Sequence, residues 1–192
     1  PHNRNRSKAL RQLPKQHAVV LAPTEDDHLV DGSLPRQMRD GGLPAWQALG
    51  QSLSSDPPEP RSAGTITVRA PFVPTVTVAE VLENIETEQR TVVDARAADR
   101  FRAGHIPCAN NRFCKDNLHN DGRFKAPEQL REEFAGVLDD PKDAIMQCGS
   151  GVTACHNLLA LEVAGMLGAA LYPGSWSEWS SDPARPVAKG DH

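Results

Sequence analysis

The chain has 192 residues, enough for one well-formed hydrophobic core or two small ones. Its formal net charge of −4 comes from mixed acidic and basic residues, which argues against a nucleic-acid or anionic-membrane partner. No apolar run is long enough to span a bilayer, and the basic opening lacks the apolar segment of a secretory signal, so no membrane partner is expected.

Four cysteines, at positions 108, 114, 148 and 155, could be free thiols, disulfide partners or metal ligands. Disulfide frameworks are typical of small secreted domains, which this composition does not resemble. Cys108 and Cys114 are spaced more widely than the ligands of common zinc sites, although His105 and His119 lie nearby. We therefore expect ordinary thiols outside position 148, no metal, and a reducing, cytoplasmic location.

The first 62 residues predict little regular structure. Residues 1–38 contain one short strand-like run, at 17–22, and no motif. Residues 40–46 align with residues 173–179, pairing Gly41 with Gly174 and Trp46 with Trp179, which indicates an internal repeat. A proline-rich run at 56–60 predicts an extended linker over residues 51–62, so that a compact domain begins at residue 63 and runs to residue 192.

The rest of the chain alternates predicted strands and helices. Alternating or apolar runs predict strands at 65–69, 91–95 and 169–172, with further short strands after residue 107 and at 145–146. Helical spacing predicts helices at 78–85 and 126–134, the second opened by Pro127. This order predicts an α/β domain with an open, mostly parallel, five-stranded sheet and helices on both faces.

A loop opened by Cys148 separates the strand at 145–146 from a third predicted helix. Gly149 and Gly151 allow a tight turn that directs several N–H groups inward, at the positive end of the helix dipole. A thiol there ionises more readily than a free cysteine, whose pKa is about 8.5. Cys148 is therefore a candidate nucleophile.

Cysteine phosphatases use a similar loop. Their loop closes with an arginine that holds two phosphate oxygens. Here the corresponding residues are Val152, Thr153 and Ala154, so a phosphate ester would lack this contact.

The sequence Cys-Gly-Ser-Gly-Val-Thr at 148–153, followed by Ala-Cys-His, resembles the active-site loop of 3-mercaptopyruvate sulfurtransferases in the rhodanese superfamily. Gly149 and Ser150 match that type, whereas thiosulfate-preferring relatives have basic residues there. Four further motifs resemble the family in the same order, so that the resemblance covers residues 63–190: Val-Val-Asp-Ala-Arg at 92–96, Arg-Phe at 100–101, Gly-His-Ile-Pro at 104–107 and Tyr-Pro-Gly-Ser-Trp-Ser-Glu-Trp at 172–179.

The resemblance implies a sulfurtransferase that moves sulfur from 3-mercaptopyruvate or thiosulfate through a Cys148 persulfide to a thiol or cyanide, without a cofactor. A thioredoxin-like protein is one candidate acceptor. Ser150 would lie beside the leaving group, and Arg100 would bind the substrate carboxylate. The residues around the anionic sulfur would be Gly149, Gly151, Val152 and Thr153.

The chain also departs from the family. Full-length relatives contain two repeats, and the first is thought to supply a His and an Asp that assist the position of Ser150. Residues 1–50 look like a remnant of that repeat, with no match to either residue. The alternative function is therefore a persulfide carrier or protein-binding module with little turnover. The face that normally meets the first repeat predicts self-association as a homodimer.

Several residues near the motifs have two interpretations. Arg96 and Arg102 are expected on a solvated helix face, paired with Asp99 or a glutamate, rather than at the substrate. His105 is expected to be structural. Trp176 and Trp179 are expected in the core, with a place in the cleft wall as the alternative.

Overall fold

The computed structural model describes residues 18–20, 37–50, 53–56 and 72–191. The chain divides into two compact units, residues 1–60 with 119–124, and residues 61–118 with 125–192. The predicted strand at 65–69 and most of the predicted linker lie outside the described residues.

In the first unit, strand β1 (Ala18–Val20) pairs antiparallel with β2 (Gln37–Arg39). Helix α2 (Gly42–Ala48) follows at the segment predicted to be a repeat. It begins directly after Gly41, as α7 (Ser175–Trp179) begins after the matched Gly174. The first residues of both helices have positive φ, 58° at Gly42 and 52° at Ser175. The residues just before the helices differ, since Gly41 is left-handed with a φ of 84° and Gly174 is right-handed with a φ of −62°. The origin of the two segments as repeats stays a prediction.

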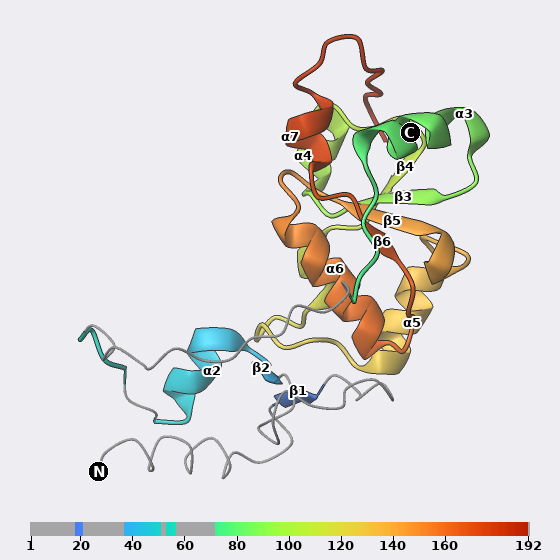
Figure 1. Cartoon of the computed structure of the whole chain (residues 1–192). Helices are drawn as coiled ribbons and strands as arrows, with labels where there is room; N and C mark the ends of the chain where they lie inside the picture. The colour runs from blue at the N-terminus through green and yellow to red at the C-terminus, as the bar shows by residue number, and fades with distance from the viewer. Residues whose placement is uncertain (1–17, 21–36, 51–52, 57–71, 192) are drawn as a thin grey trace, which may run out of the picture. The chain divides into compact units, whose positions relative to one another are not determined.

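The second unit is built on a parallel sheet with the order β4-β3-β5-β6 (Figure 1). Its strands are β3 (Thr91–Asp94), β4 (Ala109–Asn111), β5 (Ala144–Gln147) and β6 (Ala170–Leu171). The prediction of an α/β parallel sheet is confirmed, but the described residues form four strands rather than five. At the β6 edge, only Thr75 pairs with Leu171 through an isolated parallel bridge, so the fifth position is too short to count as a strand.

Helices cover both faces of this sheet (Figure 1). One face packs against α3 (Val78–Thr87), α4 (Ala98–Ala103) and α7, and its core includes Val81, Phe101, Tyr172 and Trp179. The other face is covered by α5 (Pro127–Ala135) and α6 (Val152–Val163), which contact each other. Short 3-10 segments occupy Cys114–Asn117 and Pro141–Asp143. No helix in the described ranges is long and apolar enough to cross a membrane.

Local sequence explains where the predicted helices begin. Helix α3 starts with a capping box, in which the Thr77 hydroxyl accepts from the Glu80 N–H and the Glu80 carboxylate accepts from the Thr77 N–H. Helix α5 starts with Pro127, which needs no hydrogen-bond partner at the first position. Both helices lie within two residues of their predicted bounds.

The strand order places a switch point between β3 and β5. The chain leaves β3 through α4 to reach β4 on one side, and then returns through α5 to β5 on the other side. In open parallel sheets, the loops that leave two such strands at their carboxyl ends diverge and open a crevice. The loops after Asp94 and after Gln147 are therefore the expected walls of a site.

Candidate active site

The loop from Cys148 to Gly151 connects β5 to α6 and is shaped by one close approach. Gly151 has a φ of 84°, and a Cβ atom at this position would lie 2.7 Å from the carbonyl oxygen of Pro173. Any other residue would be strained there and would also collide with the neighbouring backbone. The glycine lets α6 begin directly behind Cys148.

The N-terminal turn of α7 donates hydrogen bonds to carbonyl groups of this loop. The N–H of Trp176 donates to the Cys148 carbonyl at 3.0 Å, and the N–H of Ser177 donates to the Gly149 carbonyl at 2.9 Å. The Cys148 N–H in turn donates to the Ser175 hydroxyl at 3.1 Å. Because these groups bond to α7, the remaining loop N–H groups are available to the Cys148 side chain.

Cys148 is 1% exposed, yet its side chain is the floor of a pocket and its thiolate is stabilised. Burial raises the pKa of Cys148, but hydrogen bonds from the Thr153 hydroxyl and from the N–H groups of Ala154, Ser150 and Thr153 lower it more, so the pKa lies below that of an ordinary cysteine. The nucleophile predicted from the loop is thus in a setting that favours the charged form.

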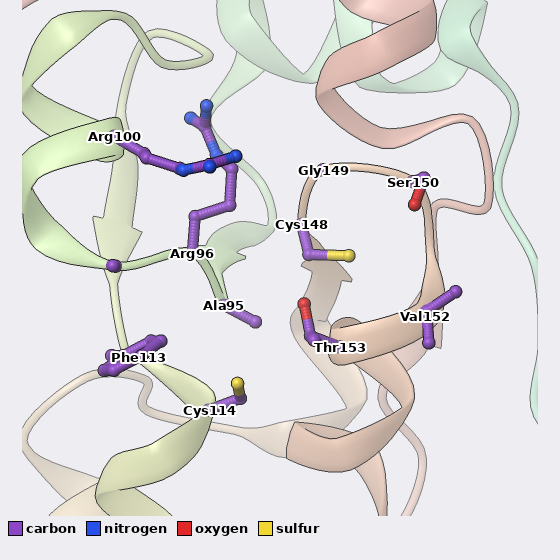
Figure 2. A pocket seen from close by; sticks show the side chains of 11 residues that line it. Ala95, Arg96, Arg100, Phe113, Cys114, Cys148, Gly149, Ser150, Val152 and Thr153 are labelled. Atoms are coloured by element: carbon purple, nitrogen blue, oxygen red, sulfur yellow. The ribbon is translucent and has the colours of Figure 1, made fainter.

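The pocket has a volume of about 260 Å³. The loop after β5 forms one wall, and Arg96 and Arg100 lie across the cavity from it (Figure 2). Phe113 and Cys114, from the segment after β4, close a further side. Eleven residues line the cavity: Ala95, Arg96, Ala97, Arg100, Phe113, Cys114, Cys148, Gly149, Ser150, Val152 and Thr153.

Six of the seven predicted site residues line this pocket, namely Arg100, Cys148, Gly149, Ser150, Val152 and Thr153. Gly151 does not line it. Gly151 is buried, and its backbone lies close to that of Pro173. Val152 is 74% exposed, at the rim.

Arg100 lies on α4 with its side chain exposed at the pocket. Among the described residues, no hydrogen bond or ion pair of its guanidinium is found. A guanidinium with unused donors is suited to bind an anionic ligand in a bidentate manner.

The prediction for Arg96 was wrong. Arg96 is 8% exposed and forms a buried ion pair with Asp94 at 2.6 Å, where an exposed pair with Asp99 or a glutamate was expected. Its guanidinium also donates to the Gly104 carbonyl at 2.8 Å and lies 4.6 Å from the centre of the Trp176 ring. The burial of Arg96 could not be predicted from the sequence, because Gly104 and Trp176 come close to its guanidinium only in the folded domain. Arg102, by contrast, is exposed as expected, but it pairs with Asp191 and not with Asp99 or a glutamate.

His105, Trp176 and Trp179 lie outside the pocket lining. His105 is fully buried, stacks on Phe101 with 3.8 Å between ring centres and contacts the Phe101 carbonyl through Nδ1, in agreement with a structural role. Trp179 is fully buried and donates from Nε1 to the Pro186 carbonyl at 2.8 Å. Trp179 belongs to the hydrophobic core, and Trp176 packs against that core and contacts the guanidinium of Arg96, which lines the pocket.

Two parts of the site were not predicted. Ser175 was given no role beyond its place in the motif at 172–179, but its hydroxyl accepts from the Cys148 N–H and donates to the Tyr172 carbonyl. Cys114 was expected to be an ordinary thiol, yet it lines the pocket of Cys148. All four cysteines are free. Only the folded sheet brings the loop after β4 beside the loop after β5, so spacing along the chain could not reveal this pair.

Fold and site together define an α/β domain with a cysteine of lowered pKa in a loop of main-chain donors, at the switch point of a parallel sheet. The chain belongs to the rhodanese-like domain family, whose model matches residues 77–182.

Curated relatives include a probable 3-mercaptopyruvate sulfurtransferase of Pseudomonas aeruginosa, 44% identical over 79% of this chain and 57% of the relative. The human 3-mercaptopyruvate sulfurtransferase is 37% identical over 73% of this chain and 51% of that protein. A putative thiosulfate sulfurtransferase, SseB, of Mycobacterium tuberculosis is 35% identical over 79% and 56%. The chain thus spans about half the length of the curated relatives it matches.

Among solved structures, the anaerobic ergothioneine biosynthesis enzyme from Chlorobium limicola superposes with a TM-score of 0.65. The match covers 79% of this chain and 41% of that enzyme, at 22% sequence identity. This likeness shows the shared fold.

Proposed function

We propose that this domain is a sulfurtransferase that takes a sulfur atom from 3-mercaptopyruvate, or from thiosulfate, and passes it to a thiol or cyanide. The observation that supports this most is the Cys148 sulfur, whose pKa is lowered by loop donors, in a pocket that also contains Arg100. The names of the curated relatives support the same chemistry.

The first half-reaction forms a persulfide. The Cys148 thiolate attacks the thiol sulfur of 3-mercaptopyruvate, an S–S bond forms, and the C–S bond breaks with its electron pair going to the enolate of pyruvate. The enolate then takes up a proton to give pyruvate. Arg100 binds the carboxylate, and Ser150 lies beside the departing enolate oxygen.

The second half-reaction restores the enzyme. An acceptor thiolate or cyanide attacks the outer sulfur of the persulfide, and the S–S bond breaks with its electrons returning to Cys148. The loop donors that lower the pKa of Cys148 also make its thiolate a good leaving group. The same pocket geometry therefore serves both steps.

The test is to incubate the protein with 3-mercaptopyruvate and, separately, with thiosulfate, and to measure its intact mass. We expect a gain of one sulfur on Cys148 that is lost on adding cyanide, and no gain at that position in Cys148→Ser. A domain that loads sulfur but releases none to cyanide or thiols would instead be a persulfide carrier. Absence of loading from both donors contradicts the proposal.

A second experiment tests the substrate role of Arg100. Arg100→Ala is expected to raise the KM for 3-mercaptopyruvate roughly tenfold to a hundredfold, because charge-assisted hydrogen bonds contribute about 1.5–3 kcal/mol. Thiosulfate, which has no carboxylate, should show a smaller change. Arg102→Ala is the matched control, since Arg102 lies on the same helix but pairs with Asp191. Equal losses with both donors, or equal effects of both variants, would remove Arg100 from this role.

A further inference from the structure

A second thiol, Cys114, lines the same pocket as Cys148 and has no role in the sulfur transfer described above. It is 8% exposed and is the first residue of the 3-10 segment after β4. Its sulfur points into the pocket, toward the side of Thr153 and Cys148 (Figure 2). The other two cysteines, Cys108 and Cys155, are exposed and do not line this cavity.

Main-chain hydrogen bonds fix the two cysteines on opposite sides of Ala95. The Cys114 N–H donates to the Ala95 carbonyl at 3.1 Å, and the Ala95 N–H donates to the carbonyl of Gln147, the residue before Cys148, at 2.9 Å. Ala95 has only a methyl group and also lines the pocket. The cavity between the two sulfurs is therefore bordered by a small side chain and not filled by a large one.

The two thiols differ in the direction of their pKa shifts. The pKa of Cys148 is lowered by the loop donors, whereas burial raises the pKa of Cys114 and the negative charge of Cys148 raises it further. In thiol exchange, the thiol of lower pKa is the better leaving group. If the outer sulfur can move between the two thiols, the equilibrium therefore favours a persulfide on Cys114, because Cys148 is then the better-stabilised thiolate.

We propose that Cys114 is a second sulfur site, which accepts the outer sulfur of the Cys148 persulfide inside the pocket. This inference rests on the proposed sulfurtransferase function. The persulfide extends the Cys148 side chain by one S–S bond, about 2 Å, into the cavity that Cys114 borders. Transfer frees Cys148 for a second donor molecule, so that the domain holds two sulfane sulfurs.

The step needs no oxidant or reductant. The Cys114 sulfur attacks the outer sulfur, a new S–S bond forms at Cys114, and the old S–S bond breaks with its electron pair going to Cys148. The proton of the Cys114 thiol leaves to solvent or to the donor's leaving group. One persulfide and one thiol become one persulfide, one thiolate and one released proton, so atoms, charge and electrons balance.

The experiment loads the full chain with excess 3-mercaptopyruvate, without any acceptor, and combines intact mass with peptide mapping after alkylation of the persulfides. Wild type is expected to carry sulfur on both Cys148 and Cys114. Cys114→Ala should carry it on Cys148 and gain one sulfur fewer. The matched controls Cys108→Ser and Cys155→Ser remove an exposed thiol each and should leave the Cys114 persulfide unchanged.

The outcomes separate this inference from the proposed function. Sulfur on Cys148 but never on Cys114 of the wild type overturns the second site and leaves the sulfurtransferase intact. A Cys114 persulfide that persists in Cys148→Ser also overturns it, because Cys114 would then be loaded directly by the donor. If wild type takes up no sulfur at either position, the proposed function fails first.

Discussion

Cys148 is subject to two opposing effects, since burial disfavours its thiolate while four hydrogen bonds favour it. The hydroxyl of Thr153 is the largest of the favourable contributions, ahead of the main-chain N–H groups. The Thr153 side chain can be substituted without changing the loop backbone. The contribution of its hydroxyl to the lowered pKa of Cys148 can therefore be measured separately from that of the helix dipole.

Thr153→Val removes that hydroxyl and keeps the shape of the side chain. The pKa of Cys148 should rise, so the inflection in its rate of alkylation moves to higher pH, and at neutral pH the rate falls. The measurement is the alkylation rate of the Cys148 peptide between pH 5 and 10, followed by mass spectrometry. Val152→Ala, which changes the exposed neighbouring side chain, is the control and should leave the inflection in place. An unchanged profile in Thr153→Val would assign the stabilisation to the backbone alone.

The residues of the loop could be predicted from sequence because their contacts are local. Cys148 and its donors at 150, 153 and 154 lie within seven consecutive residues. Arg96 could not be predicted in this way, since its burial depends on Gly104 and on Trp176, which is 80 residues away along the chain (176 minus 96). Local pattern predicted the nucleophile, whereas the surroundings of the pocket depended on tertiary contacts.

At the scale of elements, the junction of β5 and α6 is held in place by the turn before α7. Four hydrogen bonds connect Cys148 and Gly149 to residues Ser175, Trp176 and Ser177. Ser175 itself has a φ of 52°, in a region where residues other than glycine are strained by about 1–3 kcal/mol. The hydroxyl bonds to Cys148 N–H and Tyr172 carbonyl compensate for that strain.

Gly151→Ala tests this junction. The new methyl group would lie 2.7 Å from the Pro173 carbonyl and would require a φ of 84° in an alanine. We expect a loss of about 1–3 kcal/mol in the free energy of unfolding and slower alkylation of Cys148, because the loop must move away from the α7 turn. Urea unfolding and the alkylation rate are the measurements.

Gly149→Ala is the matched control for this prediction. It lies two residues away in the same loop, but no heavy atom lies within 4 Å of a Cβ built there, and its φ is not in the left-handed region. Its stability should therefore stay within about 0.5 kcal/mol of wild type. Similar losses in the two variants would show that the loop tolerates no side chain at all, rather than that Gly151 makes a specific close approach.

Helices were easier to predict than strands for a physical reason. The bounds of α3 and α5 follow from caps and from Pro127, which act within a few residues. Strands β4 and β6 have three and two residues, and their existence depends on partners far along the chain. The strand expected from apolar alternation at 65–69 lies outside the described residues, so it stays a prediction. Among the described residues, the β6 edge has only the bridge at Thr75.

At the scale of the whole second unit, Glu133 connects helix α5 to the segment that runs from β4 to α5. Its carboxylate, on α5, accepts from Lys125 at 2.8 Å and from Arg112, in the segment after β4, at 2.5 Å. The Arg112 guanidinium also lies 5.1 Å from the centre of the Phe134 ring. This cluster connects both ends of the crossover from β4 to α5, and Arg112 lies two residues before the pocket residue Cys114.

The charge of Glu133 should make stability depend on pH. Burial raises the pKa of Glu133, but hydrogen bonds from Lys125, Arg112 and Gln129 lower it to about 2 from its ordinary value of 4.5. A group whose pKa is lowered in the folded state stabilises that state above its unfolded pKa. The contribution is therefore complete above about pH 5 and is lost as pH falls from about 4.5 through about 2.

Glu133→Gln removes this charge, and we expect a loss of about 1–2 kcal/mol at pH 7. A fully buried group with this pKa shift would contribute about 3 kcal/mol, and solvent screening reduces that figure because the side chain is 25% exposed. Urea unfolding at pH 7, 5, 4 and 3 should show the difference from wild type shrinking below pH 4.5. Glu132→Gln, an exposed neighbour on the same helix, controls for net charge and should show no such trend. A difference in the free energy of unfolding that stays constant from pH 7 to 3 would contradict this prediction. Glu133 would then stabilise the fold through packing and hydrogen-bond geometry, and its charge would contribute nothing.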